Sequence, residues 1–421
     1  MQTPPLFLNK KEFLAVSVFL LFIIFARLFF YYQEFLKLPK GSIYYSQAKV
    51  IQVYNSKLLK LQTPLHTLFL KTKNNQAKPL DKVYIKYFIP KELNFFDYLK
   101  GFFAKGEVLK VTNKGFDKQA FLAQKIASQH QNKEIASFYQ AIYLAQPLDR
   151  ELRKKVSNLG ISHLIALSGF HLGILWALLY GIFYLPYSYL QKRLFPWRHK
   201  KIDLGLFTLL LLGLFVLFTN SPPSLLRSYF MLFALWLAFT LSVAIFSFEF
   251  LATITLILLA LFPKLLLSWG FILSVAGVFY IFLLLKYLPN WAKRNIVIEA
   301  FVISFGVFLL MFPFAHFFFG NFSMYQLSSP LASLGFSIFY PISILLHLVS
   351  FGDMFDKFLK WYFNLGVKGV EIFLPLGAFL LYLALSFWAI FSKRAFLALL
   401  ALAGVIFGYY IMLASFSSFF E

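Results

Sequence analysis

Ten stretches of the sequence are apolar over lengths close to those needed to cross a lipid bilayer. A helix needs about 20 such residues to span the hydrocarbon core, and hydrophobic residues make up 60% of this chain. The stretches lie at residues 13–32, 161–185, 204–219, 225–246, 249–262, 265–285, 296–318, 328–350, 372–391 and 395–416. Because a helix satisfies its own backbone hydrogen bonds in lipid, we predict a polytopic α-helical membrane protein of about ten spans, in which 249–262 is the shortest.

The first apolar stretch has the features of a retained membrane anchor. Lys10 and Lys11 precede it and no small-residue cleavage site follows it, so residues 1–36 are expected to form a cytoplasmic tail and an anchor. Alternating spans then place the basic loops near residues 192–201 and 286–294 inside, as the positive-inside rule requires. Lys393 and Arg394 would lie outside, so either the last two segments form a hairpin that does not cross or one earlier segment does not span.

The composition changes between residues 37 and 115, where short β-prone runs at 48–54, 65–71 and 82–89 alternate with turn residues. This pattern predicts a small soluble β domain. Residues 33–131 hold seventeen lysines against six acidic residues, with Tyr54, Tyr84, Tyr87 and Phe88 among them. Such a surface suits single-stranded nucleic acid, and it also suits a lysine-rich solvated face.

The net charge of +23 indicates either an anionic partner or membrane topology alone, because loops of membrane proteins collect Lys and Arg. Between residues 116 and 160, apolar residues recur at helical spacing without a run long enough to span. We predict two amphipathic helices there, lying on the membrane surface or against the bundle.

Residues 160–175 combine two histidines, two serines and three glycines in an apolar context. If the segment is one helix through about Leu185, small residues recur every four positions and form a packing stripe at Gly169, Gly173, Ala177 and Gly181. Ser168 and His171 flank that stripe, and His163 lies a turn or two earlier. These polar groups either make interhelical hydrogen bonds or line an aqueous path; without a third ligand at useful spacing, we predict no metal site.

Further polar and helix-breaking residues fall near the ends of predicted spans. Arg227 either snorkels to the interface or contacts phosphate. Pro222, Pro223 and Pro313 are candidate interruptions of helices, and interrupted membrane helices often border a cavity.

The segment His163-Leu-Ile-Ala-Leu-Ser-Gly-Phe-His-Leu-Gly173 resembles the His-Leu-x-Ala-x-Ser-Gly-x-His-x-Gly signature of the ComEC family of competence proteins. Three further elements resemble family elements in the same order, at residues 221–231 (Ser-Pro-Pro-Ser-Leu-Leu-Arg-Ser-Tyr-Phe-Met), 267–274 (Leu-Ser-Trp-Gly-Phe-Ile-Leu-Ser) and 313–323. Two departures stand out: Ala145-Gln-Pro147 replaces the family's Gly-Asp-Arg type triplet, and one extra residue separates Pro222 from Arg227.

The resemblance implies a channel for single-stranded DNA in the plasma (inner) membrane. It implies a periplasmic OB-like domain at 37–115, a channel domain at 161–421, and a DNA path that includes His163, Ser168, His171, Arg227 and Ser274. It also implies a periplasmic DNA receptor, a cytoplasmic DNA-translocating helicase and a separate nuclease as partners, since the metallo-β-lactamase-like domain of longer relatives is absent from this sequence. Membrane lipid is the remaining partner, and we expect no enzymatic activity, cofactor or metal.

A small-solute transporter is the alternative. That class is expected to show paired carboxylates within the membrane or an internal repeat. Glu249, Glu299 and Glu371 all fall near the ends of predicted spans instead. A purely structural membrane scaffold would explain the packing stripe, but it would not explain Arg227 or the soluble domain.

Overall fold

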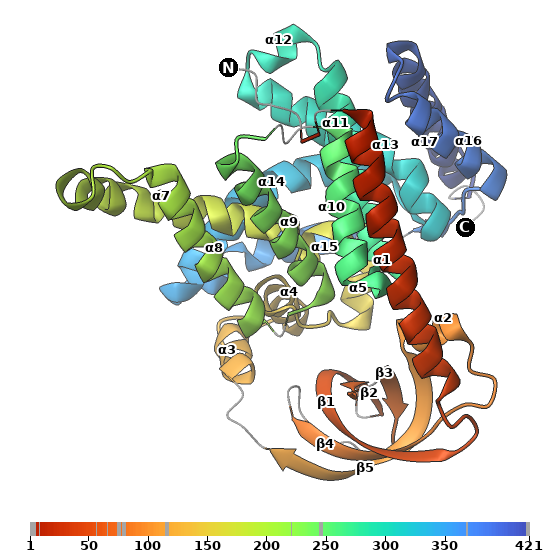
Figure 1. Ribbon diagram of the computed structural model, residues 1–421. Coiled ribbons are helices and arrows are strands. Elements are labelled where there is room, and N and C mark those ends of the chain that lie inside the picture. Colours follow the sequence, from red (N-terminus) through yellow and green to blue (C-terminus); the bar gives the residue numbers. More distant parts are fainter. Residues whose placement is uncertain are drawn as a thin grey trace.

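A small β barrel lies at one end of a helical bundle, and the long helix α1 (Lys10–Leu36) runs from the barrel along the bundle (Figure 1). The structure is a computed structural model that describes residues 6–7, 9–55, 57–64, 66–73, 77, 81–113, 118–219, 221–243, 247–367 and 369–417. The chain thus combines a small β barrel near its N-terminus with a helical bundle.

The barrel closes in the order β1-β2-β3-β5-β4. Its strands are β1 (Ile43–Asn55), β2 (Leu58–Gln62), β3 (Thr67–Lys71), β4 (Lys82–Phe88) and β5 (Phe102–Asn113). β3 and β5 pair in parallel, and the other strand pairs described in the barrel are antiparallel. Alternate residues of β4, namely Val83, Ile85 and Tyr87, point into the barrel core, as a two-residue period requires. At Gly106 a Cβ atom would collide with the carbonyl of Lys86, so β5 requires glycine at this crossing.

The three β-prone runs correspond to β1, β3 and β4, although residue 65 lies outside the described residues. The pattern missed β2 and β5. A short helix, α2 (Phe95–Lys100), precedes β5 and is capped by Asn94, whose side chain accepts a hydrogen bond from the backbone of Asp97 at 2.8 Å.

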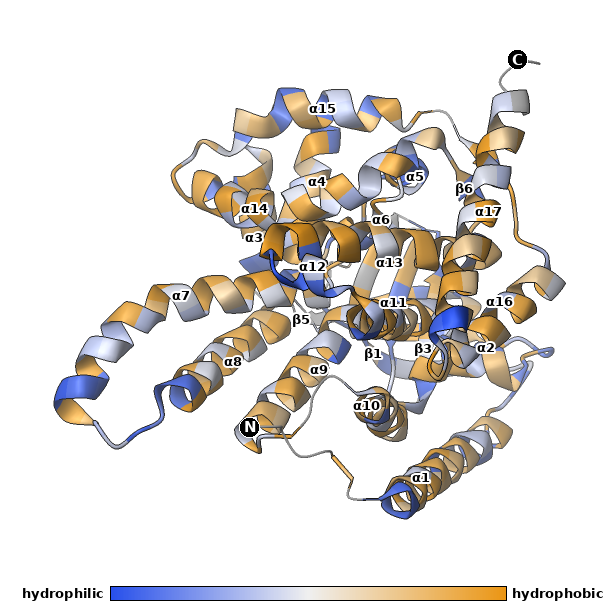
Figure 2. Cartoon of the chain, turned by 90° about the horizontal axis from the view of Figure 1, so that it is seen from above, coloured by the Kyte–Doolittle hydropathy of each residue, from blue (hydrophilic) through white to orange (hydrophobic). Residues whose placement is uncertain are grey.

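All ten predicted apolar stretches contain helix, and among the described residues seven helical segments have the length and composition to cross a membrane. These segments contain α1, α7 (Gly169–Leu194), α8 (Lys200–Phe218), α11 (Trp269–Tyr287), α13 (Ile296–Phe318), α14 (Ser329–Leu348) and α17 (Lys393–Ser417). The other three are shorter: α9 (Pro223–Thr240), α10 (Phe248–Leu261) and α16 (Leu376–Trp388). The α7–α8 hairpin extends away from the other helices and has a hydrophilic tip (Figure 2).

Residues 118–158 form three helices rather than the predicted two: α3 (Lys118–Ala127), α4 (Lys133–Leu144) and α5 (Arg150–Asn158). The extra break falls where Ala145 adopts a left-handed conformation (φ 57°), with Pro147 soon after. Ile142 and Leu152 are completely buried against α14 and α15 (Asp356–Leu365). The amphipathic helices thus pack against the bundle, which is one of the two arrangements expected.

Several aromatic contacts define the end of the bundle that carries the barrel, called here the barrel end. The Nζ atom of Lys264, in the 3₁₀ turn η1 (Pro263–Leu267), lies 6.0 Å from the ring centre of Tyr98, a residue of α2 that packs into the barrel core. Trp269, which begins α11, packs on Phe318 at the end of α13 with ring centres 4.4 Å apart. The start of α11 and the end of α13 therefore both lie at the barrel end.

The opposite, or far, end is marked by contacts between α11 and the α16–α17 turn. Lys286 donates to the carbonyl of Ile390 at 2.7 Å, and Tyr287 stacks on Phe396 with ring centres 4.8 Å apart. Lys393 and Arg394 are the first two residues of α17, directly after that turn, so they share the far end with Lys286 rather than lying at the barrel end as the alternating count required.

A two-stranded ribbon joins the two ends of the segment that contains α14 and α15. β6 (Asn321–Phe322), before α14, pairs with β7 (Val370–Glu371), after α15. The hairpin formed by η2 (Met324–Ser328), α14, η3 (Gly352–Phe355) and α15 therefore returns the chain to the level from which it left. This return agrees with the second of the two explanations, an earlier segment that adds no net crossing. Two short helices complete the chain, α6 (Ser162–Ile165) and α12 (Asn290–Lys293).

Candidate functional site

The motif-bearing segment is not one helix. α6 ends at Ile165, Ala166 is extended, and α7 begins at Gly169 with Ser168 as its N-cap. The hydroxyl of Ser168 accepts a hydrogen bond from the backbone of Phe170 at 3.3 Å, and the backbone N–H of Ser168 donates to Nδ1 of His171 at 3.4 Å. This reciprocal capping box satisfies two backbone donors at the helix start. The predicted continuous helix through Leu185 is therefore wrong at its beginning.

His171 is completely buried between aromatic rings of α14. Its ring centre lies 5.0 Å from that of Phe336 and 4.9 Å from that of Tyr340, both edge-on. Since Nδ1 accepts from Ser168, the ring proton of neutral His171 lies on Nε2. Nε2 is buried, and among the described residues no hydrogen bond to it meets the distance and angle of a normal hydrogen bond; the backbone of Leu164 interacts with the ring electrostatically.

His163 lies on the accessible side of α6 and binds α14. Its Nε2 is 3.0 Å from the hydroxyl of Ser333, which itself donates to the carbonyl of Ser329. Because that hydroxyl hydrogen is already used, Nε2 of His163 is the donor. The hydroxyl of Ser329 in turn donates to the carbonyl of Gly160 at 3.0 Å. His163 thus makes an interhelical hydrogen bond, which is one of its two expected roles.

Arg227 lies in the second turn of α9 and is 7% exposed. Its Nη2 donates to the carbonyl of Gly270 in α11 at 3.1 Å, and its guanidinium carbon lies 5.6 Å from the ring centre of Phe271. Its Nε has no hydrogen-bond partner among the described residues. An arginine held by one carbonyl and one aromatic face is oriented but keeps unused donors.

Of the three glycines predicted to form the packing stripe, only Gly169 lies at a close contact between described helices. A Cβ atom on Gly169 would lie 3.3 Å from the hydroxyl of Ser228, so α7 and α9 meet closely there. Gly173 and Gly181 have nothing within 4 Å of that position among the described residues, so the packing stripe is reduced to its first member. Ser274 is half-buried in α11, one turn beyond Gly270.

The predicted helix breaks also divide. Pro222 is the N-cap of α9 and Pro223 its first residue, so these prolines start a helix after a connection rather than break one. Pro313 lies within α13, which continues from Ile296 to Phe318. The expected interruption at Pro313 is therefore not seen.

The first turns of α7 and α11 and the second turn of α9 meet at this place. Gly169 of α7 contacts Ser228 of α9, and Arg227 of α9 binds Gly270 of α11. Each helix N-terminus carries a partial positive charge from its unpaired backbone N–H groups. Together with Arg227, they make the barrel end of the bundle locally electropositive. We call Ser168, Gly169, His171, Arg227 and Gly270 the N-terminal cluster.

Sequence reasoning missed several members of this region. Ser228 and Gly270 lie inside the quoted motifs at residues 221–231 and 267–274, so their presence was detectable but their contacts were not. Phe336 and Tyr340 enclose His171 from a segment about 165 residues later and carry no local signal.

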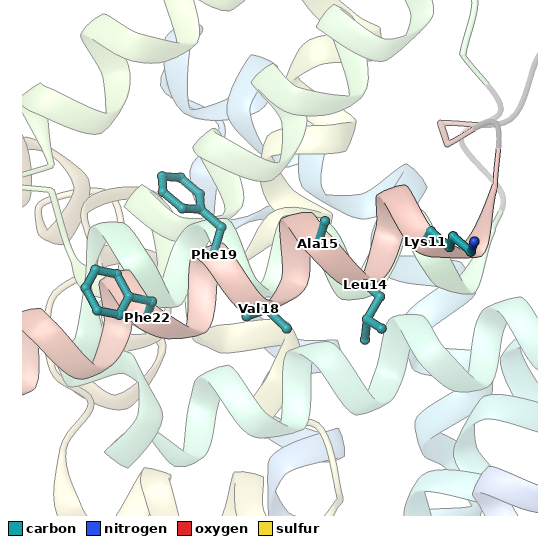
Figure 3. A pocket seen from close by; sticks show the side chains of 6 residues that line it. All are labelled: Lys11, Leu14, Ala15, Val18, Phe19 and Phe22. Carbon is teal, nitrogen blue, oxygen red and sulfur yellow. The ribbon is translucent and has the colours of Figure 1, made fainter.

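Two other features lack the chemistry of a site. A surface hollow along α1 is lined by Lys11, Leu14, Ala15, Val18, Phe19 and Phe22 (Figure 3). Leu14, Phe19 and Phe22 are each more than 60% exposed on this apolar helix, as expected for contact with lipid. No group of three or more His, Cys, Asp or Glu side chains in the described part of the chain is arranged to hold a metal ion.

The fold and the N-terminal cluster define a polytopic helical membrane protein with a β barrel at the end where positively charged helix termini converge. A family model for Competence protein matches residues 145–415, which is well over half of the chain. The chain belongs to this family, and the ComEC resemblance noted in the sequence is confirmed. No curated protein and no solved structure matches it.

Proposed function

We propose that this protein is a channel that passes single-stranded DNA across the plasma membrane into the cytoplasm during natural transformation. Membership of the competence family is the observation that carries this proposal and supports a role in DNA uptake. In this arrangement the barrel faces the periplasm and the far end faces the cytoplasm.

The distribution of basic residues supports this orientation. Lys286, Lys393 and Arg394 gather at the far end, and Lys192 and Arg193 lie at the opposite end of α7 from the N-terminal cluster. Cytoplasmic loops of membrane proteins carry such an excess of Lys and Arg. With the α14–α15 hairpin returning to its starting level, Lys286, Lys393 and Arg394 fit one side of the membrane.

A surface on the barrel supports single-stranded DNA as the ligand. Phe69 and Phe103, on the paired strands β3 and β5, stack with ring centres 5.0 Å apart, and Tyr54 lies 6.2 Å from Phe69. Lys60 and Lys71 place their Nζ atoms 5.6 Å and 5.5 Å from the rings of Phe69 and Phe103. We call these five residues the aromatic face. Exposed rings stack on bases while neighbouring lysines neutralise phosphates.

The closed strand order supports an OB-like assignment of the barrel. Its helix α2, however, lies between β4 and β5.

The N-terminal cluster supplies a second set of groups suited to a polyanion. Three helix N-termini and Arg227 favour negative charge at the barrel end, where a strand leaving the barrel would enter the bundle. His163, Ser168, His171 and Ser274 would then border or brace the path. Because the Arg227 side chain is mostly buried, we assign it to the wall of the entrance rather than to free solvent.

The channel would depend on other proteins for capture and for energy. We propose a periplasmic DNA receptor on the barrel side, and a DNA-translocating helicase on the cytoplasmic side that supplies the energy. The second strand would be degraded by a separate nuclease, and the chain itself would act as a conduit rather than an enzyme. A solute transporter is expected to have paired carboxylates within the membrane. Glu249 and Glu299 do not meet that expectation, since each lies in the first turn of its helix.

The test is uptake of labelled DNA by transformable cells whose own copy of this protein is replaced by a variant. Arg227→Ala should leave DNA in the periplasm and reduce cytoplasmic DNA about tenfold or more, because the entrance loses its fixed cation. Arg27→Ala is the matched control, since Arg27 is a second arginine in an apolar helix whose Nη1 binds carbonyls, those of Ala260 and Leu261, outside the cluster. Normal uptake by Arg227→Ala at equal membrane levels, or an equal loss in both variants, would overturn the role assigned to the cluster.

A further inference from the structure

Three titratable side chains from separate segments meet at the tip of the α14–α15 hairpin. His130 comes from the turn between α3 and α4, His347 from the last turn of α14, and Asp356 begins α15. Nδ1 of His130 lies 2.9 Å and 3.0 Å from the two carboxylate oxygens of Asp356, and Nε2 of His130 lies 3.0 Å from Nε2 of His347. We call these residues the histidine–aspartate cluster. They belong neither to the motifs nor to the N-terminal cluster.

The cluster is shielded from solvent on several sides. The side chain of His130 has no exposed surface and stacks on Tyr139 with ring centres 4.6 Å apart. The titratable groups that face the cluster are Asp353 from η3 and the two tyrosines Tyr139 and Tyr143 from α4. Burial raises the pKa of both tyrosines, so they are neutral over the ordinary pH range. Burial also raises the pKa of Asp356, an effect reinforced by Asp353 and opposed by His130.

The contacts fix how many protons the cluster holds. Nδ1 of His347 lies 2.7 Å from the carbonyl of Ser343, which can only accept, so this nitrogen carries a hydrogen. Nδ1 of His130 faces the Asp356 carboxylate and carries a hydrogen for the same reason. The remaining Nε2–Nε2 contact is a hydrogen bond only if one further hydrogen lies between the rings.

Two neutral imidazoles supply two N–H groups, and these contacts use three. The cluster therefore holds one proton more than two neutral rings and an ionised carboxylate would. If Asp356 is instead protonated and donates to Nδ1 of His130, the total is unchanged, because His130 then donates from Nε2.

We propose that the histidine–aspartate cluster is a proton-operated latch that fastens the α14–α15 hairpin to the α3–α4 turn. With the third proton bound, the three groups form a continuous hydrogen-bonded chain. Once that proton leaves, two nitrogen lone pairs face each other at 3.0 Å, and the rings must separate. Gln129 completes the latch by donating to the carbonyl of His347 at 3.1 Å and accepting from the backbone of Gly352 at 3.0 Å.

The latch has a direction in pH and a route to the functional site. A folded state that binds an extra proton is stabilised below the ordinary histidine pKa of about 6.5 and loses that stabilisation as pH rises through the pKa of the cluster. The hairpin that it fastens also carries Phe336 and Tyr340, which enclose His171. Alkaline release of the tip therefore loosens one wall of the N-terminal cluster. This inference does not depend on which molecule crosses the membrane.

The absence of cysteine from the sequence makes a site-specific test direct. Lys133→Cys and Met354→Cys place two spin labels on exposed positions beside the latch, Met354 being 69% exposed. In the full chain in lipid nanodiscs, the label distance should be short and narrowly distributed at about pH 5.5 and longer and broader at about pH 9. An unchanged distance distribution across this range overturns the proposal without recourse to any further variant.

Two further variants separate the latch from general electrostatics. His347→Gln replaces the ring by a neutral amide that can both donate and accept, so the pH transition should disappear or its midpoint should move by at least about one pH unit. Asp353→Asn removes the neighbouring charge without touching His130, and the transition should persist. Retention of the wild-type transition in His347→Gln, or its loss in Asp353→Asn, contradicts the latch.

Discussion

The aromatic face of the barrel gives the most quantitative prediction. Phe103 is 57% exposed and stacks on Phe69, so Phe103→Ala removes a base-stacking surface while removing little buried core. Stacking of one base on an aromatic ring contributes about 1–3 kcal/mol. The dissociation constant for single-stranded DNA should therefore rise roughly 5- to 150-fold at constant salt.

Lys71→Ala should act on the same face in a different way. Its Nζ lies 5.5 Å from the Phe103 ring, where it can neutralise one phosphate of a stacked strand. Each phosphate contact to a single strand contributes about 0.7 to the slope of log K against log salt, so the slope should become shallower by about that amount. Phe103→Ala should leave the slope unchanged.

The assay is fluorescence anisotropy of a labelled oligothymidylate with the full chain in detergent, measured from low to moderate salt. Phe96→Ala is the matched control, because Phe96 is 63% exposed on α2 and has no part in the aromatic face. Equal weakening by Phe103→Ala and Phe96→Ala, or binding that does not respond to salt, would refute the reasoning.

Three stability predictions follow from other contacts, each measured by unfolding of the full chain in detergent. Gly169→Val should lower the unfolding free energy by about 1–3 kcal/mol, since its side chain meets Ser228, whereas Gly173→Val should stay within about 0.5 kcal/mol; similar losses in both would contradict the close α7–α9 contact. Burial, with a contribution from Lys264, lowers the pKa of His66 to about 4. The contribution of neutral His66 to the unfolding free energy is therefore complete above the ordinary histidine pKa of about 6.5. It is lost as pH falls to 4, a change of about 3 kcal/mol. Equal unfolding free energies at pH 7 and pH 4 would exclude this contribution. Arg27→Leu should cost about 1.5–3 kcal/mol, because two carbonyls at the end of α10 lose a charged donor; full stability would mean that water replaces the guanidinium.

Much of the membrane domain could be predicted from apolar length alone. The ten stretches all contain helix because lipid leaves the backbone little alternative. The number of membrane crossings was harder to predict from the sequence, since α14 has the composition of a span. The pairing of β6 with β7 shows that the chain comes back to its starting level after α14 and α15, and no local pattern records that pairing. In the barrel, β5 was missed because Lys105, Gly106 and Glu107 interrupt its apolar pattern.

The candidate site was predicted in its residues but not in its geometry. Ser168 and His171 were singled out, yet their relation is a helix cap, and hydropathy cannot distinguish a cap from a helix interior. The histidine–aspartate cluster was not predicted because His130 and His347 are 217 positions apart. Such contacts follow from tertiary packing, which no local pattern records.

The central claim is that DNA passes through this chain beside the N-terminal cluster. Because the sequence has no cysteine, Ser168→Cys offers a single thiol there, and Val405→Cys offers one on α17 that is 69% exposed on an apolar helix. Cells expressing either variant would be given single-stranded DNA carrying thiol-reactive groups and a bulky end that halts it during uptake. The account predicts a DNA adduct at position 168 and none at position 405. No adduct at position 168 while uptake proceeds, or equal adducts at both positions, would contradict it.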